Sequence, residues 1–123
     1  MLPIILSDVK KNLIKSAIIN EYRIDLLIDN MKFWKKGKDI YPNNIKSIIN
    51  SDYPVVYKVL DEIKKMGILE YRFEVYCSIC NKYLDIKQLK SLNEFPKDLY
   101  CDENHKLNPV DNTILIYKVI RDE

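Results

Sequence analysis

The chain has 123 residues, of which 47% are hydrophobic and 31% are charged, as in folded globular domains and unlike disordered tails. Its formal net charge of +2 is too small to imply nucleic-acid binding by itself. The presence of only two glycines excludes glycine-rich phosphate loops and dinucleotide fingerprints, and the single histidine argues against most enzymes.

The chain begins with six apolar residues, Met1–Leu6, and then turns polar. Six residues cannot cross a bilayer, and neither a basic region nor a small-residue cleavage site accompanies them. We therefore expect a cytoplasmic protein with no membrane association. An odd number of cysteines fits a reducing compartment, in which thiols bind metal or stay free.

Apolar residues that recur every three or four positions predict four helical segments, over residues 7–20, 21–34, 42–49 and 54–66. Ser7 is a candidate N-cap, and the first two segments can also form one long helix because no Gly or Pro separates them. Pro54 suits the start of the fourth helix, and Gly67 suits the left-handed position that follows its end. Trp34 is expected in the core.

A strand is predicted over residues 69–76, where apolar and charged or polar side chains alternate. The order of a short helix, a turn, a second helix, the Lys65-Met66-Gly67 turn and a strand resembles a winged helix-turn-helix over roughly residues 24–76. An unrelated cluster of three helices and one strand would give the same pattern.

Two pairs of candidate metal ligands follow this strand: Cys77 with Cys80, and Cys101 with His105. The two residues between Cys77 and Cys80 let both sulfurs face one point. The three residues between Cys101 and His105 let the longer imidazole side chain reach the same point. Four such ligands complete the tetrahedron of a closed, structural Zn²⁺ site, and the paired spacing matches a zinc ribbon. The sequence therefore predicts structural zinc.

Other interpretations of this pattern remain open. Asp102 or Glu103 competes with His105 as the fourth ligand, because zinc ribbons more often close with a second Cys-x-x-Cys. The thiols can also be buried side chains without metal. A redox pair is disfavoured because the helical βαβ setting of such pairs is absent, and three thiolates would make a catalytic zinc a poor Lewis acid.

The C-terminal third is predicted to carry strands over residues 82–86 and 113–121. Apolar side chains between the two ligand pairs are expected to cover the metal: Leu89, Leu92, Phe95 and Leu99. The predicted fold class is α+β. It has a helical, winged-helix region over residues 1–76 and a zinc-ribbon-like region with the C-terminal strand over residues 77–123, packed as one compact domain.

Candidate interaction residues lie on the fourth helix and in the basic loop before the third, namely Tyr53, Tyr57, Lys58, Lys35, Lys36 and Lys38. Tyrosine is enriched at protein interfaces. The fourth helix offers no arginine for guanine contacts, and Asp52 and Asp61 would repel phosphates. A protein partner is therefore favoured over DNA, and no oligomeric state is predicted.

The whole arrangement resembles the winged-helix-plus-zinc-ribbon units of microbial transcription factors, and also small modules that accompany effectors and ATPases in bacterial anti-phage conflict systems. The residues that carry the resemblance are Ile63–Leu69, Cys77–Cys80 and Leu92–Cys101. In both groups the zinc is structural. The resemblance implies a non-enzymatic regulatory or adaptor subunit that acts through protein contacts; the alternative is a DNA-binding transcriptional regulator.

Overall fold

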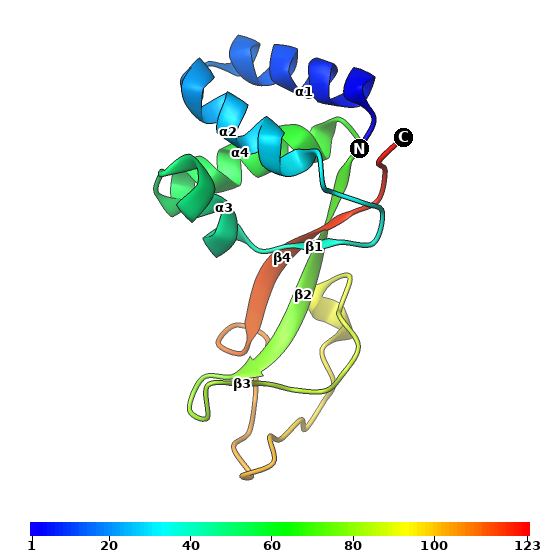
Figure 1. The fold of residues 1–123 in the computed structure, drawn as a ribbon. Helices are drawn as coiled ribbons and strands as arrows, with labels where there is room; N and C mark the ends of the chain where they lie inside the picture. The colour runs from blue at the N-terminus through cyan, green and yellow to red at the C-terminus, as the bar shows by residue number, and fades with distance from the viewer. The chain divides into compact units, whose positions relative to one another are not determined.

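The structure, a computed structural model, describes residues 1–123 and divides them into two compact units. The first unit comprises Met1–Glu70 and Tyr117–Glu123, and the second comprises Tyr71–Ile116. The chain enters the second unit within one strand and leaves it within another (Figure 1). The second unit therefore begins inside the strand predicted at residues 69–76.

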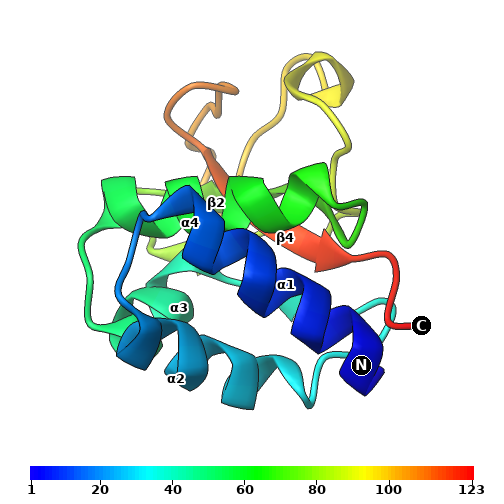
Figure 2. The same ribbon diagram turned by 90° about the horizontal axis from the view of Figure 1, so that it is seen from above.

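Four helices make up most of the first unit: α1 (Pro3–Ser16), α2 (Glu21–Met31), α3 (Pro42–Ile49) and α4 (Tyr53–Lys65). Each helix packs on the next along the chain, and α1 also contacts α4, so that the four close a ring (Figure 2). Trp34 is fully buried, as predicted, and its Nε1–H donates to Asn30 Oδ1 at 2.9 Å. None of the helices is both long and apolar enough to span a membrane.

The start of α1 differs from the sequence prediction. The helix begins at Pro3 and not after Ser7, with Leu2 in the N-cap position. Proline is favourable in the first turn because its φ is already helical and its missing N–H would have no partner there. The early start also buries Ile5 and Leu6 in the core.

Two helices, and not one long helix, form at the N-terminus. Ala17 adopts a left-handed conformation (φ 55°) that ends α1. The Asn20 side chain then accepts a hydrogen bond from the Arg23 N–H at 3.0 Å and caps α2. This reversal turns α2 back along α1.

The connection between α3 and α4 is short, and the helix end on each side of it is fixed by a local conformation or a hydrogen bond. Asn50 (φ 48°) ends α3 in the left-handed region, and Asp52 Oδ1 accepts from the Val55 N–H at 3.2 Å to cap α4. Gly67 (φ 78°) follows the end of α4, as predicted from the sequence.

The sheet has four antiparallel strands in the order β1-β4-β2-β3: β1 (Asp39–Ile40), β4 (Thr113–Val119), β2 (Leu69–Cys77) and β3 (Lys82–Tyr83). In the first unit Asp39 pairs with Lys118, and in the second Tyr76 pairs with Tyr83. The strands predicted over residues 82–86 and 113–121 are present but end earlier. The fold class is α+β, as predicted.

Candidate metal centre

The first ligand pair lies on the hairpin formed by β2 and β3. Cys77 is the last residue of β2 and pairs with Lys82, the first residue of β3. Asn81 takes a left-handed conformation (φ 54°) in the turn, and the Cys80 N–H hydrogen-bonds to Cys77 Sγ at 3.4 Å. This tight turn places both thiols on the same side of the hairpin end.

The second ligand pair lies on a short loop that closes on itself. The Cys101 N–H donates to the His105 carbonyl at 3.0 Å, and Tyr100 and Lys106 form a bridge just outside the pair. Asn104 is left-handed (φ 63°), and the His105 N–H points back to Cys101 Sγ at 3.4 Å. The two loops thus share one hydrogen-bond pattern, in which a backbone N–H is directed at the sulfur of the first cysteine of the pair.

The structure brings the four predicted ligands together, with all donor atoms within 4.8 Å of one another. Cys80 Sγ lies 3.7 Å from Cys101 Sγ. The Nδ1 atom of His105 lies 3.7 Å from Cys77 Sγ, 3.3 Å from Cys80 Sγ and 3.2 Å from Cys101 Sγ. With metal–sulfur bonds of about 2.3 Å and metal–nitrogen bonds of about 2.0–2.1 Å, tetrahedral donors are about 3.5–3.8 Å apart. The four residues can therefore hold a metal ion.

The competing ligand Glu103 has a different position. Its Oε2 lies 3.3 Å from Cys80 Sγ, while the close group of donor atoms consists of the three cysteines and His105. Glu103 therefore contacts one ligand from outside the group, and Asp102, also exposed, is not in the group either. This geometry favours His105 as the fourth ligand.

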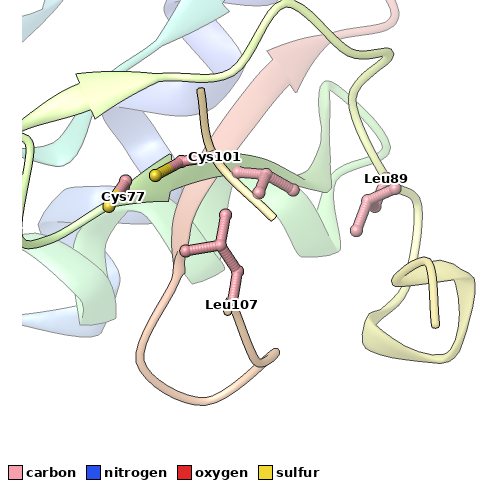
Figure 3. Packing of buried hydrophobic residues seen from close by; sticks show 5 residues of the cluster. Cys77, Leu89, Cys101 and Leu107 are labelled. Atoms are coloured by element: carbon pink, nitrogen blue, oxygen red, sulfur yellow. The ribbon is translucent and has the colours of Figure 1, made fainter. Parts of the chain in front are cut away.

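The centre is built into the core of the second unit. Its buried cluster consists of Val75, Cys77, Leu89, Cys101 and Leu107. Figure 3 shows the side chains of Cys77 and Cys101 close together above Leu107. Phe95 and Leu99 pack against this cluster as expected, whereas Leu92 is 41% exposed and does not cover it. Two of the five core residues are thus also candidate ligands.

The electrostatics of the thiols differ between positions. The hydrogen bond from the Cys80 N–H lowers the pKa of the Cys77 thiol. Burial raises the pKa of the Cys80 thiol to about 12, and the Glu103 carboxylate acts in the same direction. A coordinated dication deprotonates its thiol ligands, so bound metal would oppose the shift at Cys80.

The six candidate interaction residues lie in two places in the first unit. On α4, Tyr53 is 43% exposed, and its ring stacks on that of Tyr57 with centroids 6.3 Å apart. Lys58 is exposed on the same helix. The three lysines of the basic loop are exposed in a turn closed by a 2.9 Å hydrogen bond from the Lys38 N–H to the Lys35 carbonyl.

Sequence reasoning missed two features, one in each unit. The Nζ of Lys46, on α3, lies 5.6 Å from the centre of the Tyr53 ring, a cation–π contact. A cavity also lies beside the metal ligands, lined by residues from both ligand loops. Neither has a local sequence signal, because each depends on segments that the fold brings together.

Substitution at the fourth ligand separates the two candidate donors. We expect His105→Ala to lower metal affinity by at least about 100-fold, because a closed tetrahedral site loses a quarter of its donors. Glu103→Gln should leave a one-to-one metal stoichiometry. Competition with a chromophoric chelator measures both affinities, and equal loss in the two variants would contradict the assignment of His105.

No protein-family model, no curated protein and no solved structure matches this chain. The function of the chain is therefore inferred from its own sequence and from the arrangement of its residues.

Proposed function

We propose that this protein is a zinc-stabilised, winged-helix-type binding module that serves as a regulatory or adaptor subunit through protein contacts. The observation that carries the proposal is the closed set of three thiols and one imidazole. Sulfur-rich tetrahedral sets favour Zn²⁺. Four protein donors leave no coordination position for a reacting water, so the metal would be structural, and the protein is proposed not to be an enzyme.

The order of elements supports the winged-helix and zinc-ribbon parts of this proposal. A winged helix has a helix, a short strand, two helices and two further strands joined by the wing, and the sequence α2, β1, α3, α4, β2, β4 is consistent with that order. The two loops that carry the candidate ligands lie between β2 and β4 together with β3, in the interval where a winged helix would have its wing. Paired ligand loops, one of them on a hairpin, are what the zinc ribbon implies.

The surface of α4 supports a protein partner more than DNA. The N-terminus of a helix can bind phosphate through its free N–H groups, but here the Asp52 carboxylate already accepts from the Val55 N–H. Lys65 is paired with Glu62 at 3.0 Å. The exposed, stacked Tyr53 ring offers a rigid aromatic contact of the kind that is enriched at protein interfaces.

DNA binding by the metal-loaded protein tests the choice between partners. We expect binding to random duplex DNA to be weaker than about 10 μM at about 150 mM salt, because few unpaired basic groups face outward on α4. Fluorescence anisotropy at several salt concentrations measures the affinity and its salt dependence. Sub-micromolar binding with a slope equal to several phosphate contacts would overturn the adaptor proposal in favour of a DNA-binding regulator.

A photo-crosslinking amino acid at position 53 tests the protein contact itself. We expect a discrete protein adduct in cells that make the protein naturally. The matched control is position 22, where Tyr22 on α2 is 71% exposed. Equal crosslinking from both positions would argue against a specific surface on α4.

A further inference from the structure

A cavity of about 410 Å³ lies beside the metal centre, within the second unit. Its lining includes the three cysteines and further residues from 82–86 and 99–103. Pockets that bind small groups are commonly about 300–1,000 Å³ in volume. The cavity is therefore large enough for a side chain of a partner protein.

Aromatic and aliphatic side chains give the cavity its apolar surface. Tyr83 and Tyr100 both line it and remain 55% and 49% exposed. Leu84 and Leu99 line it as well and are half-buried. Tyr83 is fixed from one side by a tilted contact with the ring of Tyr76, whose centroid is 6.2 Å away. The apolar side chains can contact the methylene stem of a long side chain, and the faces of the tyrosine rings can contact a cation.

The charges around the cavity are predominantly negative. Three lining residues carry carboxylates (Asp85, Asp102 and Glu103), against one ammonium group, that of Lys82. A dication held by three thiolates and a neutral imidazole would add one further net negative charge beside the cavity. This acidic site contrasts with the positive formal charge of the whole chain.

We propose that this cavity binds the cationic side chain of a lysine or arginine presented by a protein partner. The charge around the cavity disfavours anions, and the carboxylates do not converge as ligands, since the close donor group contains only the three cysteines and His105. The tyrosine rings supply cation–π contacts, which carboxylates alone would not. The inference rests on the proposed protein-binding role and deepens it by naming the chemistry of the partner.

The first test uses two defined peptides, acetylated and amidated heptapeptides that alternate glycine with either lysine or glutamate. They are titrated into the metal-loaded, ¹⁵N-labelled protein. We expect the lysine peptide alone to shift amide resonances, with the largest changes at residues 82–86 and 99–103. Equal binding of the two peptides, or shifts spread over all acidic surfaces, would overturn the proposal.

The second test uses charge-neutralising variants that spare the metal ligands. The double variant Asp85→Asn/Asp102→Asn should weaken binding of the lysine peptide about fivefold or more, from the loss of two exposed charge contacts. The matched control, Asp8→Asn/Glu123→Gln, removes the same charge from exposed positions of the first unit and should change the affinity less than about twofold. Equal weakening by both doubles would show a general charge effect and overturn the site.

A third variant separates aromatic contact from charge. Tyr83→Leu keeps the apolar surface and should weaken lysine-peptide binding about threefold. An unchanged affinity would overturn the cation–π part of the site.

If the peptide fails to bind while position 53 still crosslinks to a protein, this inference fails and the proposed function stands. If the protein holds no zinc, the proposed function fails first.

Discussion

Removal of the metal from the purified protein is expected to unfold the second unit, Tyr71–Ile116. Structural zinc contributes about 10–16 kcal/mol in small zinc-binding peptides, as much as the folding free energy of a whole domain. A single core in a unit this short rarely supplies more than about 3–5 kcal/mol. Two of the five buried core residues here are candidate ligands, so little other packing would hold this unit together without metal.

Hydrogen exchange followed by mass spectrometry, before and after treatment with a strong chelator, measures this effect. We expect loss of protection in residues 71–116 and restoration by one equivalent of Zn²⁺. Cys101→Ser should reproduce the loss, and Glu103→Gln, which alters a neighbour of Cys80 but no ligand, serves as the control. Unchanged protection in the chelated protein would contradict a structural metal.

Trp34→Ala is expected to be the most destabilising single substitution in the first unit. The side chain is fully buried, and its indole N–H is bonded to Asn30 Oδ1. Truncation of a buried tryptophan costs about 3–5 kcal/mol through lost burial and the cavity that remains. It also removes the hydrogen-bond partner of Asn30.

The neighbouring aromatic residue provides the control for this prediction. Phe33 is 77% exposed, so Phe33→Ala should change the free energy of unfolding by less than about 0.5 kcal/mol. Urea unfolding followed by far-UV circular dichroism suits both variants, because Trp34→Ala removes the only tryptophan. Similar losses in the two variants would contradict the burial of Trp34.

The sequence predicted elements well where the signal is local. The helix α4 was predictable from the apolar residues Val56, Val59, Leu60 and Ile63 and from Gly67 after its end. Both signals are local, because the helical period and a left-handed residue act within a few positions. The start of α1 was predicted wrongly, since Ser7 is a good cap in isolation but Ile5 and Leu6 gain burial only in the folded helix ring.

The ligands of the candidate centre were predictable from spacing, because coordination geometry restricts how far apart two donors on one loop can be. The cavity was not predictable. Two of its lining residues, Tyr83 and Tyr100, are distant in sequence and line the same cavity only when the two ligand loops meet. Likewise, the α4 surface includes Lys46 from α3, whose position over Tyr53 depends on the angle between two helices.

The positions of the ligands in the chain also have a kinetic consequence. In the second unit β2 pairs with the residue just before β4, where the Tyr76 N–H donates to the Asn112 carbonyl at 3.0 Å. Without metal, that pairing closes the whole segment from Cys77 to Asn112. A metal that joins Cys77 to His105, which are 28 positions apart, leaves only residues 105–112 to close. The shorter path lowers the entropy cost of closure by about 1–2 kcal/mol, so a chain that captures its metal early should form this strand pair several times faster.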